Sequence, residues 1–122
     1  MGGTDIGTAG RCVAMVERVN QDFVDRSRGV FHPRVNAEAW PPVYEATRNR
    51  LDKARNECGC FELDSAEARE GCRAAQEALS SLERMIGELN TAIREGSDVG
   101  SPERRQEEIN AHLDRARRLV PG

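Results

Sequence analysis

Aromatic side chains, lysine and histidine are scarce in this chain. Aromatic residues make up 4% of the 122 residues, Lys53 is the only lysine among 18 basic residues, and there are two histidines. Charged residues, in contrast, reach 32%. This balance fits an all-β protein poorly. It suits helices with charged outer faces whose contacts are made by leucine, isoleucine, valine and alanine.

Long apolar runs and a strong net charge are also missing. No apolar stretch approaches the roughly 20 residues of a membrane-spanning helix, so we expect no membrane span. The formal net charge is −3, and no predicted helix combines clustered arginines with aromatic residues. Since a nucleic-acid partner attracts basic, aromatic-bearing surfaces, we do not expect one here.

The first residues carry no targeting pattern. Residues 1–8 have neither the basic region nor the apolar stretch of a secretory signal peptide. We therefore predict a cytoplasmic protein. A chain in which Met1 had replaced a signal peptide would instead be periplasmic or secreted.

Recognisable catalytic sets are absent as well. The glycines are scattered, and none forms a phosphate-binding loop between a strand and a helix. His112 follows Glu108 by four residues, a spacing that would let both bind one metal ion. No second pair completes such a site, so a solvated helix face is the simpler interpretation. We predict a protein that is not an enzyme and has no cofactor.

A regular apolar seam runs through the second half of the chain. Its members recur at alternating spacings of four and three, the period of a helix packed along another helix: Ala68, Cys72, Ala75, Leu79, Leu82, Ile86, Leu89 and Ile93. Asp64 and Glu67 have capping-box spacing before this seam, and Gly96 follows it. We predict one unbroken helix between these ends, about 31 residues and ~46 Å long.

Two helices are predicted before this seam. An apolar stripe between Cys12 and Phe23 indicates a helix over residues 9–27, ended by Gly29 and preceded by a flexible tail over residues 1–8. Pro41 and Pro42 suit the first turn of a second helix that begins near Trp40. Its seam repeats at the same spacings: Trp40, Tyr44, Thr47, Leu51, Ala54 and Cys58.

A fourth helix completes an all-α fold. Ser101 and Pro102 open it, and Pro121 ends it. We predict an antiparallel bundle of four helices with a long third helix, forming one domain over residues 9–120. Between residues 40 and 56 the second helix is basic, whereas the third helix is acidic. This contrast favours a coiled-coil-like hairpin of the second and third helices.

The long third helix allows two arrangements. Either one of its ends protrudes from an up-and-down bundle, or the second and fourth helices cover different halves of it. In both, part of its seam is available to a second copy of the chain, which would make the protein a homo-oligomer. Gly71 and Gly87 lie inside this helix, where they would let a neighbouring helix approach closely; simple tolerance is the alternative.

Four cysteines allow three interpretations. Cys12, Cys58 and Cys72 lie on apolar seams, as buried reduced thiols do, and the missing export signal agrees with that state. Their even number also allows disulfides, with Cys60 paired to Cys72 and Cys12 to Cys58, or the exchanged set. A metal or redox centre built from all four is the third interpretation, although Cys-Gly-Cys lacks the two-residue gap of zinc knuckles.

Recognition of another protein is the function that the residues favour. The segment from Trp40 to Tyr44 holds the only tryptophan, the only tyrosine and two prolines, and Phe31 lies near it in the sequence. These residue types anchor protein interfaces, so the interface candidates are Phe31, Trp40, Pro41, Pro42 and Tyr44. The alternative role of Trp40 is to close one end of the core. We predict a non-enzymatic adaptor, inhibitor, immunity-type or assembly protein. The rival hypothesis is a cysteine-based metal-binding or redox protein.

Overall fold

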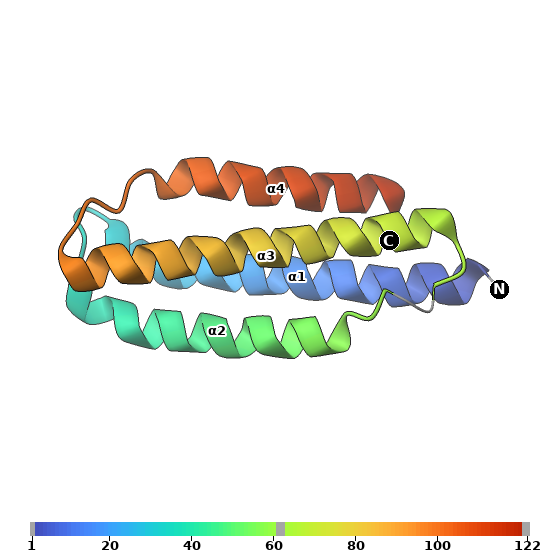
Figure 1. Ribbon diagram of the computed structural model, residues 1–122, viewed down its shortest axis with the longest axis horizontal. Coiled ribbons are helices and arrows are strands. Elements are labelled where there is room, and N and C mark those ends of the chain that lie inside the picture. The colour runs from blue at the N-terminus through green and yellow to red at the C-terminus, as the bar shows by residue number, and fades with distance from the viewer. Residues whose placement is uncertain (1, 61–62, 121–122) are drawn as a thin grey trace.

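The computed structural model describes residues 2–60 and 63–120. Within them the chain is all-α, as predicted, and it contains no strand. Four α-helices and one short 3-10 turn follow each other along the described chain: α1 Gly2–Phe31, η1 Ala37–Ala39, α2 Trp40–Glu57, α3 Ala66–Glu95 and α4 Pro102–Leu119. The helices alternate in direction and form an antiparallel bundle (Figure 1).

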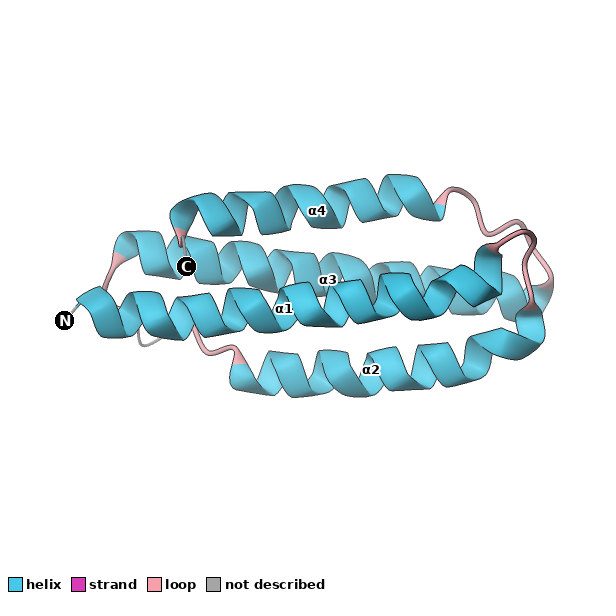
Figure 2. Ribbon diagram, turned by 180° about the vertical axis from the view of Figure 1, so that it is seen from behind, coloured by secondary structure: helices cyan, strands magenta, loops and turns pink. Residues whose placement is uncertain are grey.

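The bundle is arranged around α1 and α3. These two helices pack against each other through its middle, while α2 and α4 lie on opposite sides of them (Figures 1 and 2). The start of α3 extends past the end of α2 (Figure 1). Contacts from both flanking helices fall on overlapping parts of α3, since Asn90 binds Trp40 of α2 and Glu88 binds Arg105 of α4. This is the up-and-down arrangement with a protruding helix end.

The helix lengths and pairings match the prediction only in part. As expected, α3 has 30 residues against 18 in each of α2 and α4, but α1 also has 30 residues where we predicted a helix over residues 9–27. The most extensive packing joins α3 to α4, and the predicted hairpin of α2 and α3 is antiparallel but less closely packed. At the end of α4, Val120 packs closely against Gly71 of α3, a contact that the charge contrast does not predict.

The bounds of α1 differ from the prediction at both ends. The helix begins at Gly2, so residues 2–8 are helical where we expected a tail, and the flexibility of that segment stays a prediction. It also continues through Gly29 to Phe31. Val30 is fully buried, and this burial offsets the cost of the preceding glycine. The helix then stops before Pro33, whose ring disfavours helical geometry at His32.

The ends of α2 and α3 follow local signals. Pro41 and Pro42 occupy the first turn of α2, as predicted. The cap of α3, however, is Ser65 rather than Asp64, because the Ser65 side chain accepts a hydrogen bond from the Ala68 amide at 3.3 Å. Gly96 ends α3 in the left-handed conformation, with φ of 69°.

The predicted seam of α3 forms the centre of the core. Its residues from Ala68 to Leu89 are buried, Ile93 is half-buried, and the helix is unbroken at Ser80 and Ser81. None of the described helices has an apolar stretch long enough to cross a lipid bilayer.

Candidate binding groove between α2 and α3

Trp40 closes one end of the core. Its side chain is 1% exposed, and its indole Nε1 donates a hydrogen bond to Asn90 Oδ1 at 3.0 Å. Phe23 meets the indole edge-on, with ring centroids 6.4 Å apart, and the rings of Phe31 and Tyr44 lie at 5.9 and 5.8 Å. The indole is therefore held by three aromatic rings and one hydrogen bond, so it is an almost completely buried structural anchor.

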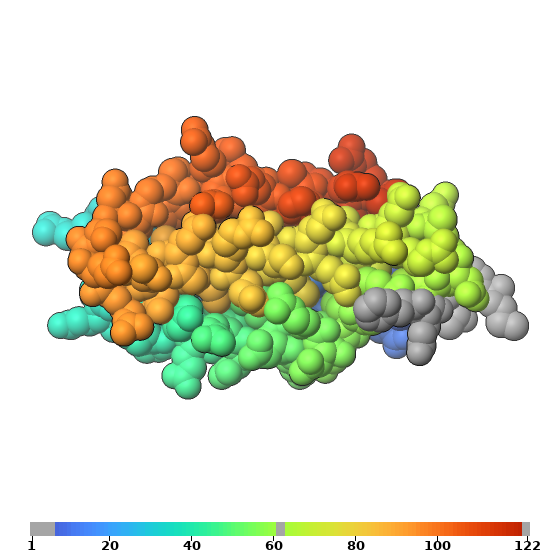
Figure 3. Space-filling model, viewed as in Figure 1, coloured from blue at the N-terminus to red at the C-terminus, as the bar shows by residue number. Residues whose placement is uncertain are grey.

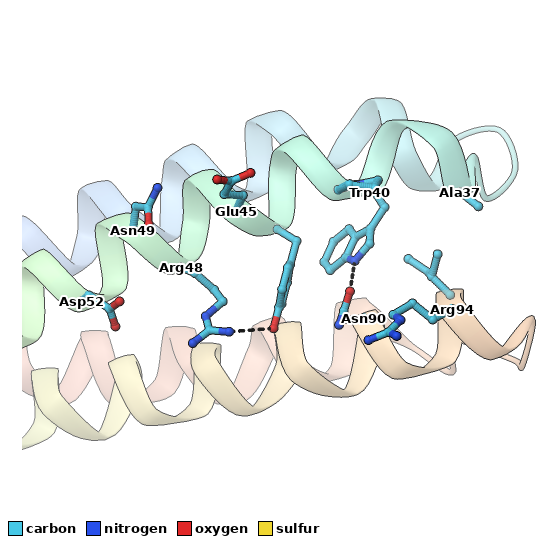
Figure 4. A pocket seen from close by; sticks show the side chains of 11 residues that line it. Ala37, Trp40, Glu45, Arg48, Asn49, Asp52, Asn90 and Arg94 are labelled. Carbon is cyan, nitrogen blue, oxygen red and sulfur yellow. Dashed lines mark hydrogen bonds between the residues drawn. The ribbon is translucent and has the colours of Figure 1, made fainter.

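A groove opens beside this tryptophan, between α2 and α3. It encloses about 780 Å³, within the range of ligand and peptide side-chain pockets. We call it the α2–α3 groove, and its lining residues come from both helices and from the turn before α2: Ala37, Trp40, Pro41, Tyr44, Glu45, Arg48, Asn49, Asp52, Asn90, Ile93 and Arg94 (Figure 4). Its floor is aromatic and its rims carry charges of both signs.

Tyr44 and Arg48 contact each other on the α2 wall. Arg48 Nη1 donates to the Tyr44 hydroxyl at 3.3 Å, and its guanidinium carbon lies 5.7 Å from the ring centroid (Figure 4). The hydrogen bond with Tyr44 raises the pKa of Arg48. Tyr44 itself is half-buried, which leaves part of its ring accessible in the groove.

The five predicted interface residues do not share one surface. Trp40, Pro41 and Tyr44 line the α2–α3 groove. Phe31 lies on the other side of the indole and lines a smaller hollow of about 170 Å³ between α1 and α4. Pro42 is exposed and lines neither.

Several groove residues were missed by the sequence reasoning. Arg48 and Asp52 follow Tyr44 at successive spacings of four, so helical periodicity could have placed them on the same face. Asn90 and Arg94 come from α3, and only the register of α3 against α2 brings them there. No sequence signal predicts that register.

The four cysteines form two disulfides. Cys12 of α1 is bonded to Cys58 at the end of α2, with Cα atoms 5.1 Å apart, and Cys60 is bonded to Cys72 of α3, with Cα atoms 5.8 Å apart. This is the first of the two pairings that we considered, and the interpretation as reduced thiols is wrong. All four residues are buried, and none is a free thiol.

His112 contacts α3 instead of sharing a site with Glu108. Its Nδ1 atom lies 3.3 Å from Glu77 Oε2, whereas Glu108 lies 4.0 Å from Arg105. Within residues 2–60 and 63–120, no group of three or more metal-binding side chains lies together. The arrangement of His112 is that of a bridge between α4 and α3.

Comparison with known proteins gives no information about the function of this chain. No protein-family model, no curated protein and no solved structure matches the chain significantly. The function must therefore be argued from the groove and the disulfides.

Proposed function

We propose that this chain is a non-enzymatic protein that binds another protein through the α2–α3 groove. The observation that carries the proposal is the Tyr44 and Arg48 pair, set beside the buried Trp40 in an open groove of about 780 Å³. Tyrosine, tryptophan and arginine are enriched among the residues that dominate binding energy, and they cluster in such pockets.

Preorganisation supports this role. Tyr44 is held by Trp40 and Arg48, and Pro41 sits in the first turn of α2. Side chains that are already ordered lose less entropy on binding, so a partner gains more of the contact energy. Exposed charges on the rim, such as Glu45 and Arg94, would then orient the partner.

The carboxylates of the groove favour binding over catalysis. Glu45 and Asp52 line it, and both are exposed to solvent. General acid–base catalysis generally uses carboxylates whose proton affinity is tuned by burial or by a close charged neighbour in a water-excluded site. An open rim with two solvated carboxylates lacks that environment.

The disulfides favour a structural role for the cysteines over the rival redox function. Their residues are between 0 and 7% exposed, and thiol–disulfide exchange needs access for an attacking thiolate. Disulfides of this kind form and persist in oxidising compartments. We therefore propose that the chain folds outside the reducing cytosol, contrary to the cytoplasmic location expected from its first residues.

Site-specific photo-crosslinking in extracts of the native host tests the proposal. A photoreactive residue at Asn49 lies in the groove, and one at the exposed Arg115 of α4 serves as the control. We expect one defined protein adduct from position 49, none from position 115, and loss of the adduct when Arg48→Glu is added. An adduct that survives Arg48→Glu, or that forms equally at both positions, would contradict a groove-centred function.

A further inference from the structure

The outer face of α3 is uncovered along the length of the bundle. In the space-filling view it runs between α4 and α2 as a continuous strip (Figure 3). Its exposed residues recur every three or four positions and are mostly charged: Glu67, Glu70, Arg73, Glu77, Ser80, Arg84, Glu88, Thr91 and Arg94. This strip shares Arg94 with the rim of the α2–α3 groove but does not include Tyr44 or Arg48.

The charges on this strip are antisymmetric about the middle of the helix. Since α3 runs from Ala66 to Glu95, its midpoint lies between Ser80 and Ser81. Reflection of the sequence through this midpoint places Glu77 opposite Arg84, and it places Arg73 opposite Glu88. Glu67 and Arg94 are related in the same way. Wherever both reflected positions are charged, the two charges have opposite sign.

The charged side chains of the two pairs nearest the midpoint, Glu77 with Arg84 and Arg73 with Glu88, can form further ion pairs. Glu77 contacts His112 through Oε2 at 3.3 Å, and Glu88 contacts Arg105 through Oε2 at 2.5 Å. The second oxygen of each carboxylate remains available, because an ionised carboxylate accepts several hydrogen bonds. Among the described residues, neither Arg73 nor Arg84 forms a salt bridge with a carboxylate.

The centre of the strip is hollowed, and the two residues at its midpoint, Ser80 and Ser81, have small side chains. A depression of about 570 Å³ surrounds the midpoint, and its lining comes from α3 and α4: Arg73, Gln76, Glu77, Ser80, Ser81, Arg84 and His112. Further along the strip, nothing lies within 4 Å of a Cβ placed on Gly87. Serine and glycine at these positions let a second helix backbone come close.

We propose that the outer face of α3 binds the same face of a second copy of this chain, antiparallel, about a two-fold axis between Ser80 and Ser81. In a two-fold interface each contact occurs twice with the roles exchanged. Arg84 of one protomer then meets Glu77 of the partner subunit, and Arg73 meets Glu88 of the partner subunit. A charge pattern that complements itself only after reversal selects a second copy in this orientation.

Charge reversal combined with mixing tests this interface. Sedimentation equilibrium at low ionic strength, without reductant, measures self-association of the full chain. We expect a wild-type dimer that weakens as salt is added, because exposed ion pairs are screened. Glu77→Arg and Arg84→Glu should each weaken self-association about tenfold or more, since each places like charges together twice.

Mixing the two single variants distinguishes this register from others. A Glu77→Arg chain carries two arginines at these positions and an Arg84→Glu chain carries two glutamates, so their heterodimer has opposite charges at both contacts. We expect the mixture to associate to within about threefold of the wild type, and the control Arg115→Glu to leave the dimer unchanged. If circular dichroism shows that Glu77→Arg or Arg84→Glu does not fold, the same mixing experiment is done with the variants Arg73→Glu and Glu88→Arg.

Two results would overturn the proposal. One is a wild-type chain that stays monomeric at every concentration and ionic strength tested. The other is a dimer that is insensitive to both charge reversals, or that is not recovered when the complementary variants are mixed. Neither result bears on the α2–α3 groove, because the crosslinking positions used there lie outside this strip.

Discussion

Val120 packs closely against Gly71, with its Cγ2 atom so near that it would overlap a Cβ added at residue 71. Val120 is fully buried, and Gly71 is buried within the first half of α3. The absence of a side chain at Gly71 is therefore what lets the end of α4 dock on α3. Gly87 of the same helix has open space around its missing Cβ, so within a single copy of the chain no contact requires a glycine there.

This contrast predicts opposite effects of one substitution at two sites. Gly71→Ala should lower the free energy of unfolding by about 1–3 kcal/mol, because it overpacks the contact with Val120. Gly87→Ala should raise it by up to about 1 kcal/mol, because alanine favours the helix. Urea unfolding of both variants measures the difference. In a Val120→Ala background the Gly71→Ala penalty should shrink, and an undiminished penalty would show that another contact causes it.

The two disulfides should stabilise the chain unequally. The Cys12–Cys58 bond spans 46 positions and the Cys60–Cys72 bond spans 12. Loop-closure entropy then predicts losses of about 4 kcal/mol for Cys12→Ala with Cys58→Ala, and about 3 kcal/mol for Cys60→Ala with Cys72→Ala. Thermal unfolding without reductant, followed by circular dichroism, measures which double variant loses more stability. A larger loss from the shorter loop would point to native-state packing rather than chain entropy.

Asn90 should contribute more to the free energy of unfolding than Asn49, which lines the other side of the groove. Asn90→Ala leaves the Trp40 indole N–H without its acceptor, and we expect a loss of about 1 kcal/mol in the free energy of unfolding. Asn49 is exposed, so Asn49→Ala should change it little. Emission from the single tryptophan follows both unfolding curves and reports the polarity around the indole. Equal effects of the two variants would rule out a specific role for the bond.

Thr47 offers a stabilising substitution. Its side chain is 1% exposed, and its Oγ1 atom has no hydrogen-bond partner among the residues that the structure describes. Valine has the same shape without the hydroxyl, so Thr47→Val should raise the free energy of unfolding by about 1 kcal/mol. Chemical denaturation measures it, and Thr91→Val, which removes an exposed hydroxyl that donates to the Gly87 carbonyl at 3.1 Å, should give no such gain. A loss of stability in Thr47→Val would mean that the hydroxyl is in fact satisfied.

Local signals predicted the helices well. The seam from Ala68 to Ile93 identified α3, Gly96 marked its end, and Pro41 and Pro42 marked the start of α2. These signals succeed because helix periodicity and capping depend on residues that are close together in the chain. The same local rules failed where a distant contact competes with them, as at Gly29, where burial of Val30 keeps α1 helical.

The candidate site was only half predictable. The cluster of Trp40, Pro41 and Tyr44 could be found in the sequence, but the burial of Trp40 follows from rings and an amide that come from α1 and α3. Arg94 joins the groove from the end of α3. A one-turn slip between α2 and α3 would remove it from the groove while preserving every local pattern.

By itself the amino-acid sequence determined that this protein is built of antiparallel helices, since apolar spacing fixes which face of each helix is buried. Tertiary structure alone decided which helices pair most closely, which cysteines bond and which side chains meet at the groove. The physical reason is that these choices depend on the register and closeness of separate helices. Gly71 can accept Val120, and Cys12 of α1 can bond to Cys58 at the end of α2, only because packing of the helices brings these residues together.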